Sequence, residues 1–241
     1  MYIKFILKIL SFFDYFKKRN VINFFKKNTI GGIDNLIDVG AHHGETIKLF
    51  NEKFKINNIF AFEPSYKNFK ILEKKTKNIT GSNLNIYNYG LGETEGLFDF
   101  NESVESQSST LVSINYKSNY YKKKEKLLQF FKKDKNLFFT TKVNIKTLDN
   151  FLKEKKLNYV EILKIDTEGY DFNVIRSLGK KINCINFIYF EHHFHNMLNK
   201  SYTFNQVNNF LTSNGFKKVF KTKMFHRKTF EYIYKNTNYR I

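Results

Sequence analysis

Short apolar runs alternate with amphipathic stretches along most of the chain, a pattern typical of a parallel sheet covered by helices. Apolar runs predict strands at 35–39, 58–62, 84–89, 160–165 and 185–190. Amphipathic stretches predict helices at 45–54, 65–75, 148–155, 172–178 and 204–212. Two further runs, 216–220 and 230–234, follow Gly215 and predict a terminal antiparallel hairpin. We therefore expect an α/β protein with a doubly wound sheet.

The ends of the first two predicted strands carry the most informative residues. The first strand leads into Asp38-Val-Gly40-Ala-His-His-Gly44, and the second ends in Glu63-Pro64. Glycines in such a turn let the backbone approach a ligand and start the next helix tightly. An acid at the tip of the adjacent strand is placed to accept hydrogen bonds from two ribose hydroxyls. The pattern predicts a site for a dinucleotide or for S-adenosylmethionine.

Two details favour S-adenosylmethionine. A dinucleotide fingerprint reads G-x-G-x-x-G, and its amides hold a pyrophosphate, but the central glycine is missing here. Asp38 stands just before the first glycine, where its carboxylate would repel pyrophosphate and attract the ammonium of a methionine moiety. An NAD-dependent oxidoreductase is therefore the less favoured alternative.

The composition is strongly basic, with 41 Lys+Arg against 22 Asp+Glu and a net charge of +19. Almost all of these cations are lysines, whereas nucleic-acid and phosphate sites favour the bidentate arginine fork. We interpret most of the charge as solvated surface and expect no specific nucleic-acid partner. A basic nucleic-acid- or membrane-binding protein with a degenerate cofactor site stays an alternative. The single cysteine, Cys184, fits a reducing compartment, so we expect a cytoplasmic protein.

The chain divides into an N-terminal amphipathic helical extension, residues 1–30, and one domain, residues 31–241. Charged residues interrupt the first 27 residues, so this segment matches neither a membrane span nor a secretory signal. We expect it to pack on the domain, with peripheral membrane contact as the alternative. Residues 93–141 are too long for a simple connection and predict an insertion over the ligand-binding edge of the sheet.

Further acids and imidazoles follow two later strands, in Asp166-Thr-Glu168-Gly and in Glu191-His192-His-Phe-His. Buried acids are costly without partners, so their presence at strand ends suggests a task. These carboxylates and histidines offer mixed oxygen and nitrogen ligands, so a metal site is an alternative. Adjacent strand residues such as His192 and His193 point to opposite sides, so no metal ligand is assigned.

In the order and content of these motifs, the chain resembles the FkbM family of S-adenosylmethionine-dependent methyltransferases over roughly residues 34–195. The matching blocks are 38–44, 62–64, 108–111, 147–151, 163–170 and the strand that ends at Glu191. The resemblance implies the class I methyltransferase Rossmann-like sheet of about seven strands with the last one antiparallel. It also implies methyl transfer to a hydroxyl, often on a sugar or small metabolite.

We assign cofactor binding to Asp38, Gly40, His42, Gly44, Glu63 and Pro64. Methyl transfer to an alcohol needs a base, because an alcohol is a poor nucleophile. The candidates for it are Asp166 and the pair Glu191–His192, in which the acid would orient the imidazole. The partner is then a small-molecule or glycan acceptor, whose identity and the oligomeric state the sequence leaves open.

Overall fold

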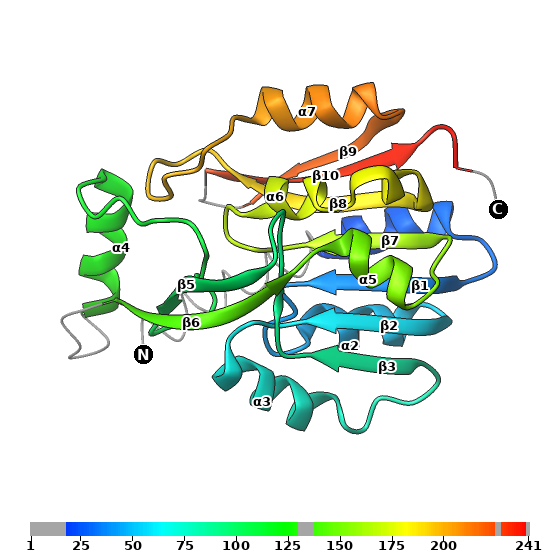
Figure 1. Cartoon of the computed structure of the whole chain (residues 1–241), viewed down its shortest axis with the longest axis horizontal. Coiled ribbons are helices and arrows are strands. Elements are labelled where there is room, and N and C mark those ends of the chain that lie inside the picture. The colour runs from blue at the N-terminus through cyan, green and yellow to red at the C-terminus, as the bar shows by residue number, and fades with distance from the viewer. Residues whose placement is uncertain (1–17, 130–136, 225–227, 240–241) are drawn as a thin grey trace.

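The computed structural model describes residues 18–129, 137–224 and 228–239. Its centre is a seven-stranded sheet with the order β3-β2-β1-β7-β8-β10-β9 (Figure 1). The strands of this sheet are β1 (Ile33–Val39), β2 (Ile56–Phe62), β3 (Asn83–Tyr87), β7 (Val160–Ile165), β8 (Ile185–His193), β9 (Phe216–Lys223) and β10 (Thr229–Asn236).

Strands β3, β2, β1, β7 and β8 run parallel, whereas β10 lies antiparallel between β8 and β9. This confirms the class I methyltransferase sheet that the resemblance implied, including the antiparallel terminal hairpin. The strand order reverses between β1 and β7, and open α/β sheets bind ligands in the crevice at such a point. The candidate site should therefore lie beyond the tips of β1 and β7.

Helices cover both faces of the sheet, and each face has its own core. The helices are α2 (Glu45–Lys53), α3 (Tyr66–Thr76), α5 (Leu148–Glu154), α6 (Asp171–Arg176), the 3₁₀ helix η1 (Gly179–Cys184) and α7 (Phe204–Ser213). Ile37 and Val39 of β1 pack into one core, and Leu36 packs into the other, as alternation along a strand requires. The sheet is thus held on both sides, which fixes the strand tips.

Residues 18–28 form a helix on one face of the domain. Val21, Ile22 and Phe25 of this helix are buried, and Phe25 meets Phe187 of β8 edge to face. This segment therefore packs on the sheet. Residues 1–17, which hold most of the predicted N-terminal extension, lie outside the described residues. Among the residues that the structure describes, no helix is both long and apolar enough to cross a bilayer.

The segment expected as an insertion has structure of its own. It includes β5 (Gly96–Ser103) and α4 (Asn119–Gln129) and leads into β6 (Phe138–Lys146), which joins β5 and β4 (Gly90–Leu91) in a three-stranded sheet. Figure 1 shows β5, β6 and α4 at one end of the main sheet. Residues 130–136 of the predicted basic-aromatic run lie outside the described part of the chain.

Candidate active site

A cavity of about 260 Å³ lies at the tips of the parallel strands and is covered by the insertion. Phe100, Ser106 and Leu111 of the insertion form part of its wall. Many acidic side chains also line it: Glu45, Glu63, Asp166, Glu168, Glu191 and Glu231. Fewer cationic residues do so, among them Lys18 and Lys164. The cavity is therefore suited to a ligand with positive charge or with many hydroxyl donors.

The glycines of the first loop are required by close packing. A Cβ on Gly40 would lie 2.0 Å from the backbone oxygen of Asp166, and its φ of +78° is one that side chains disfavour. A Cβ on Gly44 would lie 2.7 Å from Thr76 of α3, and its φ is +83°. Gly40 therefore lets the loops after β1 and β7 touch, while Gly44 seats α2 against α3.

Glu63 is fixed at the tip of β2 by two backbone donors. Its Oε2 accepts a hydrogen bond from the backbone N–H of His42 at 2.9 Å, and its Oε1 accepts one from Ser65 at 3.0 Å. Burial raises the pKa of Glu63 to about 7, against the effect of these donors, which favour the charged form. Pro64 follows directly and lines the same cavity, with its carbonyl accepting from Asn88 at 3.1 Å.

Asp38 is placed differently from the sequence-based expectation. Its side chain is fully buried, and its Oδ1 lies 2.9 Å from the Nζ of Lys164. It is not among the cavity-lining residues, whereas Lys164 is. Burial alone lowers the pKa of Lys164, but the carboxylates of Asp38 and Asp166 outweigh it and hold that pKa above its ordinary value. The expected direct contact of Asp38 with a methionine ammonium therefore does not match this arrangement, because Asp38 neutralises Lys164.

The loop after β7 brings Asp166 and Glu168 to the cavity wall. The carboxylate of Asp171 holds this loop by accepting hydrogen bonds from Thr167 N–H at 3.0 Å and from Gly169 N–H at 3.2 Å. Glu168 has a φ of +50°, which is uncommon for a side-chain-bearing residue and is maintained by these contacts. The Thr110 hydroxyl of the insertion donates to the Glu168 carbonyl at 2.8 Å. The insertion therefore helps to set the position of the loop that carries Asp166.

Glu191 and His192 lie inside β8, which continues to His193, three residues beyond the predicted strand end. Glu191 lines the cavity, and His192 does not. The His192 ring packs instead against Phe204 of α7, and its Nε2 accepts from the Nζ of Lys200 at 3.1 Å. Consecutive strand residues point to opposite faces, so Glu191 and His192 do not form the expected acid–imidazole pair. Burial lowers the pKa of His192 to about 3, so it is neutral at pH 7.

The remaining two histidines of this segment, His193 at the end of β8 and His195 beyond it, are held by structural contacts. The Nδ1 of His193 lies 3.0 Å from the Thr229 hydroxyl, and its Nε2 lies 3.6 Å from a carboxylate oxygen of Glu168. His195 stacks on Tyr120 of α4, with ring centroids 4.0 Å apart. Within the described residues, His42, His43 and Glu45 have the spacing of metal ligands, whereas the acids and histidines at and after the ends of β7 and β8 do not.

Sequence reasoning missed several cavity residues. Glu231 of β10 lies directly opposite Glu191 in the antiparallel register, and both are buried. Ser106 of the insertion places its hydroxyl 2.8 Å from the Nε2 of His42. Lys164 stands within a block quoted for the resemblance and could have been found there. Glu231 and Ser106 could not have been found, because a local sequence pattern predicts neither the register of a hairpin nor the path of a long insertion.

This fold and this site define a class of protein. Class I methyltransferases have such a seven-stranded sheet, in which the last strand of the chain, β10, runs antiparallel between β8 and β9. They also have a cavity at the tips of the strands that correspond to β1, β2 and β7. Magnesium protoporphyrin IX methyltransferase from Synechocystis PCC 6803, solved with bound S-adenosylmethionine, superposes with a TM-score of 0.51 at 9% identity, over 91% of this chain and 77% of that chain. At such identity the likeness establishes the fold.

The sequence then gives the family. The family model described as "Methyltransferase FkbM domain" matches residues 38–218, so the chain belongs to the FkbM methyltransferase domain family. A solved FkbM methyltransferase from Methylobacillus flagellatus KT is similar in structure, with a TM-score of 0.54 and 13% identity over 84% of this chain and 43% of that chain. The present chain thus spans less than half of that relative. No curated protein sequence matches it. Family and fold agree with the cofactor expected from the sequence.

Proposed function

We propose that the chain is an S-adenosylmethionine-dependent O-methyltransferase that acts on a hydroxyl of a saccharide or small metabolite. The observation that carries this proposal is Glu63, a buried carboxylate that is held by two backbone donors at the tip of β2 and lines a cavity beside the glycine loop. A carboxylate there can accept hydrogen bonds from both ribose hydroxyls of a nucleoside. Family membership supports the same reading.

The charge of the cavity supports S-adenosylmethionine over a dinucleotide. Carboxylates outnumber lysines along its wall, and a pyrophosphate would meet repulsion there. S-adenosylmethionine carries a sulfonium and an ammonium, and when bound it supplies an electrophilic methyl group. Glu63 and the loop of Gly40 and His42 would hold it, because they line the cavity together.

The residues best placed to take the acceptor's proton are Asp166 and Glu191. Both line the cavity, and they come from neighbouring strands, β7 and β8. Asp166 retains 35% side-chain exposure and lies 3.6 Å from the Nζ of Lys164, so its carboxylate is accessible from the cavity. As the hydroxyl oxygen forms its bond to the methyl carbon, the bond from that carbon to the sulfonium sulfur breaks and leaves a neutral thioether, and the hydroxyl proton passes to a carboxylate oxygen. A positioned base of this kind contributes about 10²–10⁴-fold to the rate.

The acceptor class follows from the same wall. Carboxylates accept hydrogen bonds from hydroxyl groups, which are plentiful on sugars and polar metabolites. Phosphate-rich acceptors would need arginines or lysines inside the site, and lysines are a minority there. A hydroxylated acceptor without phosphate is therefore the better match.

The test is a labelling experiment. Purified protein would be incubated with methyl-labelled S-adenosylmethionine and, separately, with a glycan fraction, a small-metabolite fraction and total RNA. We expect label in a glycan or metabolite, at a position that mass spectrometry identifies as an O-methyl group. The Asp166→Asn variant should lower the turnover by about 10²-fold or more while keeping its affinity for the cofactor. Label in RNA alone would refute the proposed acceptor.

A further inference from the structure

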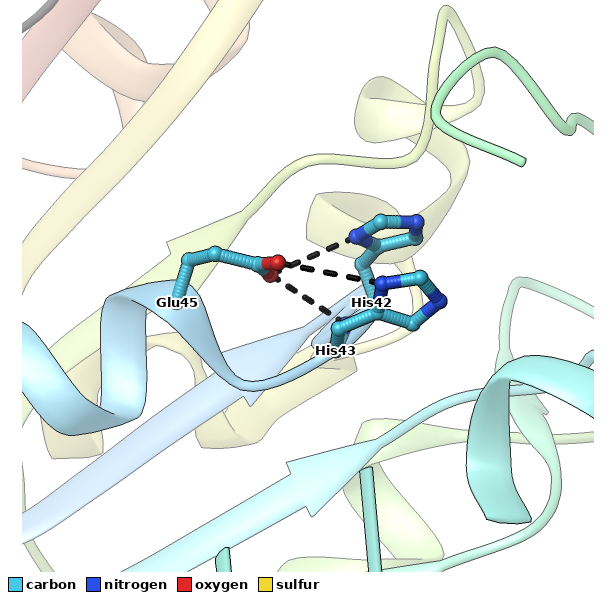
Figure 2. Close-up of side chains that lie close together, drawn as sticks. All are labelled: His42, His43 and Glu45. Carbon is cyan, nitrogen blue, oxygen red and sulfur yellow. Dashed lines mark hydrogen bonds and ion pairs between the residues drawn. The ribbon is translucent and has the colours of Figure 1, made fainter. Parts of the chain in front are cut away.

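Two imidazoles and a carboxylate meet on the loop between β1 and α2. The Nδ1 of His42 lies 3.3 Å from one carboxylate oxygen of Glu45, and the Nδ1 of His43 lies 3.8 Å from the other. Figure 2 shows both rings directed toward this carboxylate. One ligand atom from each of the three residues lies within 4.8 Å of the others. The methyl-transfer reaction proposed above uses none of these three side chains as a base.

The spacing matches what a single ion needs. Zinc binds imidazole nitrogen and carboxylate oxygen at about 2.0–2.2 Å, so two ligands of a tetrahedral ion lie roughly 3.3 Å apart. The separation of 3.3 Å at His42 meets this value, and the 3.8 Å at His43 is within half an ångström of it. Two imidazoles with one carboxylate are a donor set for zinc-like ions, whereas magnesium and calcium prefer oxygen ligands alone.

The surroundings hold the ligands in place. The other ring nitrogen of His42, Nε2, lies 2.8 Å from the Ser106 hydroxyl, and such an outer partner fixes the ring of a metal-binding histidine. The His42 backbone is tied to Glu63, and the His43 backbone N–H donates to Glu45 at 3.2 Å. The loop therefore presents its ligands with little backbone freedom.

Two features of the loop oppose ion binding, and both side-chain arrangements must change before an ion can bind. The His42 and His43 rings are stacked with centroids 3.6 Å apart and planes 24° from parallel, so one ring must rotate before both lone pairs can reach one ion. That rotation is about χ2, which has a broad energy profile in histidine. The Nζ of Lys75 lies 3.9 Å from Glu45, but the Lys75 side chain is 44% exposed and can turn its ammonium into solvent.

We propose that His42, His43 and Glu45 form a binding site for one divalent ion of the zinc class. His42 and Glu45 also line the cavity, so an ion held there stands at the cavity wall. Three protein ligands leave at least one coordination position of such an ion open to another ligand. The site shares His42 with the loop proposed to hold the cofactor, but binding of an ion can be measured without cofactor or acceptor, so its test does not depend on the methyltransferase proposal.

Calorimetric titration of the metal-free protein with zinc chloride tests the site. We expect one ion per chain, and a loss of about 10- to 100-fold or more in affinity for His43→Ala and for Glu45→Gln. His192→Ala, which alters a histidine outside the cavity, should bind as the wild type does. Absence of binding by the wild type, or equal binding by His43→Ala, would overturn the proposal.

A variant with the opposite effect separates lost ligands from lost folding. Lys75→Met removes the ammonium that competes for Glu45, so it should tighten zinc binding several-fold. Unfolding cannot produce tighter binding. Unchanged or weaker affinity in Lys75→Met would show that the ion does not bind at Glu45, and would contradict the assignment. Circular dichroism of each variant should match that of the wild type.

Discussion

The ionisation of Glu63 should control how tightly the cofactor binds. Burial raises the pKa of this carboxyl from its ordinary value of 4.5 to about 7. A group with that pKa is charged in roughly one molecule in ten at pH 6 and in nine of ten at pH 8. Hydrogen bonds from ribose hydroxyls favour the charged form, so the affinity should rise about eight- to tenfold over this interval. In Glu63→Gln the dependence should disappear, and the affinity at pH 8 should fall about 10- to 100-fold, since a charged acceptor contributes about 1.5–3 kcal/mol.

Calorimetry at pH 6, 7 and 8 would measure this effect, with S-adenosylhomocysteine as a ligand that lacks the sulfonium charge. Both ligands carry the same ribose, so both should show the same trend. A Glu63→Gln variant that keeps the wild-type pH dependence would refute the reasoning.

The raised pKa of Glu63 also affects the pH dependence of folding stability. The folded protein retains this proton between pH 4.5 and about 7, so the contribution of Glu63 to stability falls as the pH rises through that window.

Other variants test the packing and the surface. Gly40→Ala should lower the melting temperature strongly, because its Cβ would lie 2.0 Å from Asp166; Gly31→Ala, with φ +100° and no atom within 4 Å, bears only the backbone cost of about 1–2 kcal/mol. Equal melting temperatures for the two would contradict this. Asp38→Asn should cost about 3 kcal/mol in chemical denaturation, because it leaves the buried Lys164 short of its nearest anion; a loss below about 1 kcal/mol would argue against the ion pair. Binding to duplex DNA should be weak at physiological salt, with no dependence on sequence, when measured by filter retention over a salt series. Sequence-specific retention would contradict a solvated lysine surface.

The parallel strands could be predicted because each contains a short, mainly apolar segment between amphipathic stretches. Strand β7 was predicted with the bounds 160–165 that the structure has, and its six residues are all buried. The tip of β2 was equally readable, since Glu63 follows an apolar run and precedes the only proline. The hydrophobic pattern did not predict which residue would pair with a buried acid. Asp38 was expected to face a ligand, but Lys164 on the neighbouring strand is opposite it in the parallel register.

The acceptor side of the cavity was harder to predict. Adjacent residues on a strand diverge, so the extension of β8 through His192 separates Glu191 from its expected partner. Glu231 reaches the cavity only through the pairing of β10 with β8, a contact between distant segments. The length of residues 93–141 predicted an insertion over the ligand-binding edge of the sheet. The contacts of Ser106 and Thr110 could not be predicted, because they depend on tertiary packing that no local pattern encodes.

The contact between Gly40 and Asp166 has a mechanical consequence. No side-chain atom separates the two loops there, and the Asp166 backbone N–H also donates to Val39 at 2.9 Å. A displacement of the Gly40 loop, which we propose to hold the cofactor, would therefore also move the backbone of Asp166, the proposed base. Occupancy of one half of the cavity should thus alter the affinity of the other half, and we expect cofactor and acceptor to change each other's affinity by the same factor.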